Sequence, residues 1–427
     1  MTRLKRALGF PSLTFYGVGL IIGAGIYSVI GAAAGVAGNA LWWSFAFAAL
    51  IALLTGLSYA ELATAYPEAG AEYVYVRHAF PGRRWAAFVI GCILTVAAAG
   101  TAATVSIAFA GYLQLFVRVP SLPAALGVLL VGALINILGI KQASWVNIAF
   151  TLIEVAGLVL VIIVAVGEPR FGEAVRAPLS SDVLAGTAVI FFVFLGFEEI
   201  ANLSEEAERP AKDVPRAIFV SLAITTVLYI LVAFSVVALT SPPQLAASSF
   251  PLATALATVS PAGARALGAM ALFSTANTAL LTMIAGSRML FSMARSGQMP
   301  AVLSGVLPNR KTPWVAALVV FAVAAALAPL GDVKVVGSLA SLLSIIAFVA
   351  VHISLIVLRY REPRRKRPFR VPIRIGRFPL LPAFGVVSAV VLAFHFEPFV
   401  YLLGTAVTGT SLLAYWLVRK NLNGSRS

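Results

Sequence analysis

The sequence predicts an all-α polytopic membrane protein with about twelve transmembrane helices. Of its 427 residues, 60% are hydrophobic and only 11% are charged, and the mean hydropathy is +0.97. Soluble globular domains carry about a quarter charged residues. Apolar runs of roughly 20 residues, long enough to cross a bilayer core, recur along the whole chain. The single cysteine, Cys92, excludes an intrachain disulfide.

Prolines and charged residues separate these apolar runs and mark where the helices end. The first run is too long for a signal peptide and lacks a small-residue cleavage pattern, so we expect it to remain as the first span. The expected spans are residues 13–37, 41–66, 86–117, 122–140, 144–167, 183–205, 216–240, 264–293, 313–330, 335–358, 378–395 and 398–418.

The distribution of basic residues predicts the orientation of the spans. With the N-terminus in the cytoplasm, only five of the 31 Lys and Arg residues fall on the outer side, namely Arg118, Arg170, Arg176, Arg265 and Lys334. Short cytoplasmic segments of membrane proteins carry such an excess of basic residues. We therefore expect a multi-pass protein of the plasma membrane with both termini in the cytoplasm.

The densest basic run, R-Y-R-E-P-R-R-K-R-P-F-R at 359–370, has two interpretations. In the favoured interpretation it is a stop signal that fixes the topology. In the other interpretation it touches anionic lipid headgroups. Binding of nucleic acid is not expected despite the net charge of +15, because the basic residues lie in short loops between spans.

The first span contains an interruption, L-I-I-G-A-G-I-Y at 20–27, with two glycines at its centre. Glycine costs about 1 kcal/mol relative to alanine inside a helix. The spacing does not fit a dinucleotide-binding fingerprint, and no strand precedes it. Close packing of a second helix against Gly19 and Gly23, which form a G-x-x-x-G pattern, is the structural alternative.

A second interruption favours a binding site instead. The sixth span, A-V-I-F-F-V-F-L-G-F-E-E-I-A-N-L at 188–203, also has a central glycine, here followed by two carboxylates. Paired interruptions at corresponding positions indicate an inverted-repeat transporter with its site at the membrane midplane. The ends of the broken helices present amide N–H groups and carbonyls. These two kinds of end match the carboxylate and the ammonium of an amino acid.

Several stretches of the chain resemble the amino acid–polyamine–organocation transporter superfamily. The motifs that carry this resemblance are G-L-I-I-G-A-G-I-Y at 19–27, P-E-A-G-A-E-Y-V-Y-V-R-H-A-F at 67–80, F-L-G-F-E at 194–198, L-S-E-E-A-E-R-P-A-K-D-V-P-R-A-I at 203–218, G-S-R-M-L-F-S-M-A-R-S-G-Q-M-P at 286–300 and K-T-P-W at 311–314. The resemblance covers residues 8–420. It is specific for the superfamily and not for a substrate.

The resemblance implies a single domain over 1–427, built as a five-plus-five inverted repeat that works by alternating access. Its first repeat would span about 13–167, its second about 183–358, and two extra helices about 378–418. By position, the amides around Gly23, Ala24 and Gly25 would hold a substrate carboxylate. Carbonyls near Ile21, Phe192 and Leu195 would hold the ammonium, and Ile22 and Gly196 complete this substrate-binding set. Phe197 would be a gate over the substrate, with plain core packing as the alternative.

Acidic residues inside spans are expensive to bury and are therefore functional candidates. We expect Glu198 to cap the second half-helix at its positive end or to form another hydrogen bond, ahead of contacting substrate. We expect Glu199 to pair with a polar group of the scaffold. Glu205, Glu206 and Glu208 lie at the cytoplasmic end, where a solvated face or a loop contact is expected.

Glu154 stands where some proton-coupled relatives of this superfamily have a lysine, which puts the lysine mechanism in doubt here. Burial favours the neutral form of a carboxyl group, so Glu154 is our candidate for proton coupling, together with Glu198. The alternatives are a structural pairing with Asn147, Thr151 or a serine on the eighth span, and a sodium ion held by oxygens of Ser274, Thr275 or Thr278.

The function that these observations predict is a secondary active transporter, a proton-coupled permease for neutral amino acids. The alternative is a sodium-independent exchanger of cationic amino acids or polyamines, which Glu198 and Glu199 would favour. We expect no enzyme activity, cofactor or metal, because H-E-x-x-H, paired-cysteine and G-x-S-x-G motifs are absent from the sequence. The expected partners are the amino acid, a proton or sodium ion and the lipid bilayer, and the protein would be a monomer or homodimer.

Overall fold

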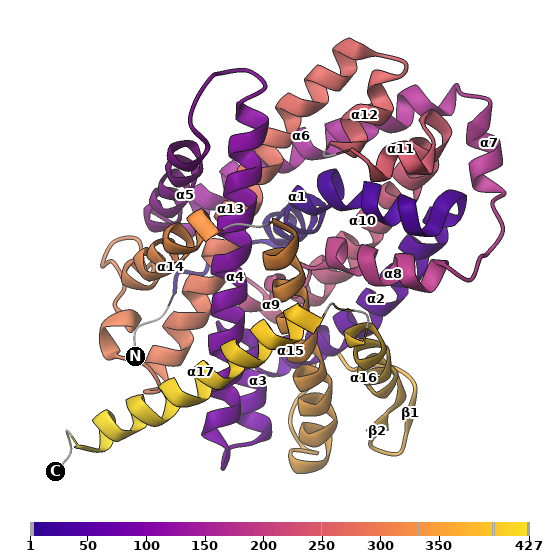
Figure 1. The fold of residues 1–427 in the computed structure, drawn as a ribbon. Coiled ribbons are helices and arrows are strands. Elements are labelled where there is room, and N and C mark those ends of the chain that lie inside the picture. The colour runs from indigo at the N-terminus through magenta and orange to yellow at the C-terminus, as the bar shows by residue number, and fades with distance from the viewer. Residues whose placement is uncertain (1–3, 249, 331–332, 395, 397, 425–427) are drawn as a thin grey trace.

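The computed structural model describes residues 4–248, 250–330, 333–394, 396 and 398–424. Nearly all of this chain is helical (Figure 1). The long helices are α1 (Phe10–Ala37), α2 (Leu41–Ala65), α4 (Arg84–Leu113), α5 (Ser121–Leu138), α6 (Ile140–Val166), α10 (Pro210–Leu239), α13 (Pro261–Arg295), α14 (Trp314–Leu327), α15 (Val333–Arg361), α16 (Leu380–Ala393) and α17 (Pro398–Gly424).

The sixth span is assembled from three pieces, α8 (Val183–Phe191), η2 (Phe192–Phe194) and α9 (Glu199–Asn202). Among the described residues, ten segments are long and apolar enough to cross a membrane, and α14 and α16 are shorter apolar helices. The prediction of an all-α polytopic membrane protein is therefore confirmed. The predicted spans lie within a few residues of the observed helices, with two larger differences: α10 begins at Pro210 and carries Pro215 inside it, and α17 continues to Gly424.

Short elements connect the long helices. They are α3 (Ala71–Ala79), α7 (Arg170–Val175), α11 (Pro242–Ala246), α12 (Pro251–Ala257), η1 (Gly38–Ala40), η3 (Ala301–Ser304), η4 (Ala328–Leu330), and the strands β1 (Arg374–Ile375) and β2 (Phe378–Pro379). The two strands pair antiparallel, with Ile375 opposite Phe378. They form a small hairpin directly before α16.

Helix α1 is central to the bundle: it packs against α6, α8, α10 and α13 (Figure 1). Its apolar side chains are buried on nearly every face, which is the pattern of a helix surrounded by others rather than by lipid. By contrast, α17 lies on the outside against α4 and α15 and exposes large apolar side chains such as Trp416 and Leu402. The two extra helices are thus peripheral to the interrupted ones.

The segment before α1 is tied to the turn that follows α9. A parallel bridge joins Leu8 to Ala207. The Leu8 amide donates to the Glu206 carbonyl at 3.1 Å, and the Glu208 amide donates to the Leu8 carbonyl at 2.9 Å. The beginning of the chain therefore adds backbone hydrogen bonds to the end of the sixth span.

Two basic residues that were counted on the cytoplasmic side, on the argument that such residues lie in short loops, are inside helices. Arg288 is inside α13 and fully buried, and Arg359 lies in the last turn of α15 and is also buried. Neither lies in a loop, and each has a buried carboxylate partner. The side chain of Lys334, assigned to the outer side, lies outside the described residues.

Candidate functional site

Both predicted interruptions are present. Gly23 leaves helical geometry inside α1, with φ 16° and ψ −166°. In the sixth span the chain is extended at Leu195, with φ −61° and ψ 141°, and Gly196 has φ 124°, a value that favours glycine. Each break exposes backbone groups that a continuous helix would pair internally.

The two breaks lie against each other. A Cβ atom placed on Gly196 would come within 3.1 Å of the Leu20 carbonyl carbon and 3.2 Å of the Ile21 nitrogen. On the other side of the first break, the Gly25 Cβ position is 3.6 Å from the backbone of Val193. The sequence-predicted substrate-binding residues of both spans are therefore brought together at one place.

The first half of the site presents amides. The Ala24 amide donates to the hydroxyl of Thr278, on α13, at 3.1 Å. The same hydroxyl would lie 2.6 Å from a Cβ on Gly23, so only glycine lets α13 approach this closely. Thr278, considered from the sequence as a ligand for sodium, instead contacts the backbone where a substrate carboxylate is expected.

The Glu198 side chain bonds to the second break itself. Its carboxylate accepts a hydrogen bond from the Gly196 amide, two residues earlier, at 2.8 Å. Glu198 precedes α9 but makes no side-chain cap hydrogen bond to that helix. The expected capping is therefore not seen, the contact is a hydrogen bond within the break, and a coupling role for Glu198 stays a prediction.

The carbonyl side of both breaks is bridged by a residue that sequence reasoning missed. The Tyr229 hydroxyl, from α10, donates to the Ile21 carbonyl at 2.6 Å and lies 3.3 Å from the Val193 carbonyl. Its ring packs against Phe45 and Phe194 at centroid distances of 5.5 and 5.3 Å. The sequence shows only that a tyrosine lies within an apolar helix, and it does not show which neighbouring helix the hydroxyl faces.

The site is shielded from solvent. Ile21, Ile22 and Phe197 are each at most 1% exposed, and Ala24 is 8% exposed. Phe197 packs edge-on against Tyr59, with ring centroids 6.1 Å apart, and tilted against Phe348 at 5.9 Å. Phe197 thus sits in an aromatic cluster directly after the break, and its role as a gate stays a prediction.

Glu154 lies in a polar cluster between α6, α13 and α1. Its Oε1 accepts a hydrogen bond from the Asn277 side-chain amide at 3.0 Å. The same amide nitrogen lies 3.1 Å from the Asn147 Oδ1 and 3.4 Å from the Thr151 hydroxyl. The direct side-chain partner is an asparagine of α13, not one of the serines considered from the sequence.

This cluster leaves several buried polar atoms without a hydrogen-bond partner among the described residues. They are the Glu154 Oε2, the Asn277 Oδ1, the Asn147 Nδ2 and the Ser274 Oγ. Buried polar atoms are normally paired, so unpaired ones call for a proton, an ion or a water. A proton on Glu154 would add a donor where acceptor oxygens are now in excess.

A Cβ on Gly19 would lie 2.1 Å from the Thr151 hydroxyl and 2.7 Å from the Asn147 Oδ1. The glycines at 19 and 23 therefore do permit close helix approach, as the packing alternative expected. Gly19 serves that packing next to the Glu154 cluster, whereas Gly23 also forms the break itself.

A second acidic cluster joins the end of the sixth span, α9, to α3. The Asn202 side-chain nitrogen contacts the Glu199 Oε2 at 2.6 Å and the Glu72 Oε2 at 3.4 Å. The Tyr59 hydroxyl donates to the Glu72 Oε1 at 2.9 Å. Burial raises the pKa of Glu72 above its ordinary value. Sequence reasoning missed Glu72, because it lies in a short helix outside the expected spans.

The expected cytoplasmic end is closed by ion pairs. Glu206 was expected in a solvated or loop contact, but it is 1% exposed and accepts a hydrogen bond from the Arg288 Nε at 2.8 Å. Asn136 accepts a further one from Arg288 at 2.6 Å. Nearer the surface, Arg295 binds both oxygens of Glu205 at 2.6 and 2.7 Å. These pairs join α13 to the turn after α9.

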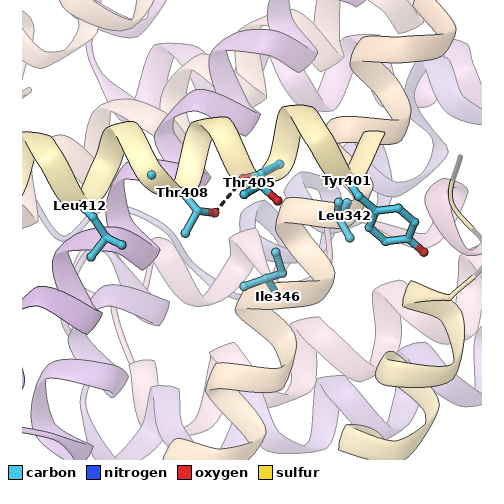
Figure 2. A pocket seen from close by; sticks show the side chains of 8 residues that line it. Leu342, Ile346, Tyr401, Thr405, Thr408 and Leu412 are labelled. Carbon is cyan, nitrogen blue, oxygen red and sulfur yellow. Dashed lines mark hydrogen bonds between the residues drawn. The ribbon is translucent and has the colours of Figure 1, made fainter. Parts of the chain in front are cut away.

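A cavity of about 340 Å³ lies between α15 and α17, far in sequence from either break (Figure 2). Figure 2 shows Leu342, Ile346 and Leu412 lining it together with small residues of α17. Its lining is mostly apolar and belongs to the peripheral helix, so it has the chemistry of a lipid-facing groove rather than of a polar substrate site. The described residues form no group of three or more His, Cys, Asp or Glu side chains suited to a metal ion.

Comparison with known proteins places these features in a family context. The family model described as "Amino acid permease" matches residues 8–418. The chain is similar to the branched-chain amino acid permease BcaP of Bacillus subtilis, with 31% identity over 91% of this chain and 88% of that protein. It is 31% identical to the methylthioribose transporter of Bacillus subtilis, over 90% of this chain and 87% of that protein. It is 32% identical to the human cationic amino acid transporter 4, over 84% of this chain and 61% of that protein.

Proposed function

Because the chain belongs to the amino acid permease family, we propose that it is a secondary active transporter that carries a neutral amino acid by alternating access, coupled to protons. One observation carries this proposal. The breaks at Gly23 and at Leu195–Gly196 meet, so that amides of one broken helix and carbonyls of both converge on a single buried place.

In this proposal the substrate carboxylate is received by the amides around Gly23, Ala24 and Gly25. The substrate ammonium is received by the carbonyls of Ile21, Phe192 and Leu195. A carbonyl oxygen has two lone pairs, so Ile21 can bind the ammonium while it also accepts from the Tyr229 hydroxyl. The Thr278 hydroxyl must shift or share the Ala24 amide when the carboxylate enters.

The preference for a neutral side chain rests on the chemistry around the breaks. Glu198, the nearest carboxylate, is engaged by the Gly196 amide. Phe192, Phe197 and Leu195 supply apolar surface beside the backbone groups. Similarity to a permease named for branched-chain amino acids supports the same substrate class.

Exchange of cationic amino acids or polyamines is the second candidate. It is favoured by similarity to a protein named as a cationic amino acid transporter. The carboxylates of Glu198, Glu199 and Glu72 would supply the complementary charge. For this candidate Glu198 would have to leave the Gly196 amide in order to reach the substrate.

Coupling is assigned to Glu154. When the carboxyl is protonated, its second oxygen can donate to the unpaired Oδ1 of Asn277, and when it is ionised that contact is lost. The cluster spans α6 and α13 and touches α1 near Gly19, so protonation would change how α1 packs next to the break. Binding of sodium by the same unpaired oxygens is the alternative.

The proposal also includes the five-plus-five inverted repeat and insertion in the plasma membrane with both termini in the cytoplasm. The test is a thermal-shift screen of the detergent-purified protein against the twenty amino acids and common polyamines, since a ligand that binds the native state raises the melting temperature. Hits are then assayed for uptake into proteoliposomes with and without an inward proton gradient. Shifts by neutral amino acids and gradient-driven uptake are expected, and shifts by arginine or putrescine alone would favour the second candidate.

A further inference from the structure

The basic run before α16 has two structurally different halves. Residues 359–377 contain nine Lys and Arg residues. Four of them hydrogen-bond or pair with the helix bundle, two of these (Arg361 and Arg365) from exposed positions: Arg359, Arg361, Arg365 and Arg367. The other five are exposed and, among the described residues, form no side-chain hydrogen bond or ion pair: Arg364, Lys366, Arg370, Arg374 and Arg377. Four basic residues of the run thus anchor it to the helix bundle, and the other five are free to contact something outside the bundle.

The inner half makes a rigid attachment. Buried Glu61, on α2, receives hydrogen bonds from Arg359 at 3.0 and 2.5 Å and lies 3.2 Å from the Arg367 Nε. It also accepts the Val371 amide at 2.7 Å. The Leu380 amide donates to the Ile373 carbonyl at 3.2 Å, which joins the two arms of the segment to each other. The chain is therefore anchored to α2 at Val371 and continues into α16 at Leu380.

The held segment is a basic hairpin, defined here as residues 370–379. Its turn is two residues long, Gly376 and Arg377, because Ile375 pairs with Phe378. Two isoleucines project from it, Ile373 with 60% and Ile375 with 70% of their surface exposed. Such exposure of two β-branched side chains next to each other would cost free energy in water.

The backbone at the base of the hairpin is strained. Ile373 has φ 58°, in the left-handed region that β-branched residues rarely adopt. Strain of this kind persists where the surrounding structure imposes it and often marks a functional position. Ile373 lies two residues after the anchored Val371 and directly before β1, and its side chain is 60% exposed.

Positive charge surrounds the isoleucines. Arg370, Arg374 and Arg377 are exposed, and within the described part of the chain no hydrogen bond or ion pair joins them to another side chain. Partial desolvation, followed by the charge of Arg374 and of other nearby arginines, lowers the pKa of Arg370. Arg370 and Arg374 thus repel each other, and buried Glu61 offsets only part of the positive charge around Arg370.

The position of the hairpin, directly before a lipid-facing helix, indicates that it contacts the membrane surface. Strand β2 runs directly into α16 (Figure 1). The α16 side chains Phe384 and Val387 are each 60% exposed, as in a helix that faces lipid. Ile375 is therefore within a few residues of the level at which the chain enters the bilayer. Apolar tips flanked by arginines match the acyl boundary and the phosphate layer of a membrane.

We propose that the basic hairpin is a lipid-binding element that docks on an anionic phospholipid leaflet, with Ile373 and Ile375 inserted at the acyl boundary and Arg370, Arg374 and Arg377 on the headgroup phosphates. The positive-inside pattern makes this the cytoplasmic leaflet. Each basic residue near such a surface adds roughly fivefold to the affinity, so three of them bind anionic lipid selectively over zwitterionic lipid.

The first arm of the test measures depth. A spin label is attached at Ile375→Cys in a Cys92→Ser background, and the full-length protein is reconstituted in phosphatidylcholine with or without phosphatidylglycerol. The label is expected to be more accessible to oxygen than to a water-soluble nickel reagent, most strongly with phosphatidylglycerol. A label at Ala301→Cys, in the exposed η3, is the matched control and is expected to be aqueous.

The second arm measures lipid retention. Native mass spectrometry is expected to show several-fold less bound phosphatidylglycerol for the combined Arg370→Gln, Arg374→Gln and Arg377→Gln variant. The combined Lys212→Gln and Arg216→Gln variant removes two other exposed basic residues and is expected to match the original protein. An aqueous label at Ile375 in both lipid mixtures overturns the proposal, as does unchanged lipid retention. Dipolar broadening between labels would instead place Ile375 between two copies of the chain, and that also overturns it.

Discussion

The Tyr229 hydroxyl donates to the Ile21 carbonyl at 2.6 Å, and thereby joins α10 to the open end of the first broken helix. The same hydroxyl lies 3.3 Å from the Val193 carbonyl, beside the second break. One side chain thus fixes the relative position of both breaks.

Replacing Tyr229 with phenylalanine should weaken substrate binding more than it weakens the fold. The ring contacts with Phe45 and Phe194 remain, so the fold is largely kept, but the hydroxyl that holds the Ile21 carbonyl beside the Val193 carbonyl is lost and the two breaks are positioned less well for the substrate. We expect the KM for uptake to rise about tenfold, with a small decrease in melting temperature. Tyr75→Phe is the control, because the buried Tyr75 hydroxyl has no hydrogen-bond partner among the described residues. Equal KM values for both variants would contradict this role.

Glu154→Gln should abolish accumulation driven by a pH gradient and leave counterflow measurable. Glutamine can still accept the hydrogen bond from Asn277 but cannot exchange a proton. Uptake and counterflow are compared in proteoliposomes with and without a gradient. The exposed Glu173→Gln is the matched control on the same chain. If the Glu154 variant still accumulates substrate against a gradient, Glu154 is not the coupling group.

Gly196→Ala should inactivate transport while Gly111→Ala leaves it unchanged. Alanine at position 196 meets both a φ of 124° and the backbone of the first break at 3.1 Å, so the two breaks must separate. At Gly111 a Cβ would find nothing within 4 Å. We expect a loss of uptake of at least about 100-fold for the first variant, corresponding to roughly 3 kcal/mol. Retained uptake by Gly196→Ala would show that the breaks need not touch.

Breaking the buried pair of Arg288 and Glu206 should destabilise the protein strongly. Glu206→Gln leaves the Arg288 charge buried without its counter-charge, at a cost of about 3–5 kcal/mol. We expect a large drop in melting temperature for this variant. The combined Arg288→Met and Glu206→Met variant removes both charges and should recover part of the loss. A combined variant less stable than Glu206→Gln would argue against this interpretation.

Glu68 should make a pH-dependent contribution to stability at acidic pH. The His78 ring, whose Nε2 lies 3.5 Å from a Glu68 oxygen, together with the charge of Arg77, lowers the pKa of Glu68 from 4.5 to about 2. The ionised form is thus favoured by folding, so its contribution is complete above pH 4.5 and is lost as the pH falls toward 2. Melting temperatures measured across this range should fall more steeply for the original protein than for Glu68→Gln. Because Glu68 is 37% exposed, the difference should be small.

The spans and both breaks could be predicted from the sequence, because apolar length and centrally placed glycines are local signals. Gly23 and Gly196 are visible as interruptions without knowledge of any neighbour. The partners of these breaks could not be predicted. Tyr229 reaches Ile21 across 208 positions, and Asn277 reaches Glu154 across 123. Such contacts depend on which faces of packed helices meet, and hydropathy does not encode this.

The misassigned arginines show a different limit. Arg288 and Arg359 were placed in loops by charge alone, although Arg288 lies within an apolar run. Burial of an arginine requires a carboxylate at a matching depth, and those carboxylates, Glu206 and Glu61, are distant in sequence. An ionisable residue inside a span is expensive to bury whatever its sign, so an arginine at position 288 indicates a buried partner just as a glutamate in a span does.

The bridge between Leu8 and Ala207 connects the end of the sixth span to the segment that precedes α1. Since Ala7 and Leu8 are hydrogen-bonded to the turn after α9, any displacement of α9 must either carry them along or break those bonds. A fluorophore on the exposed Arg6 position would register such a movement, and removal of the residues before Gly9 would release the turn after α9 from these bonds.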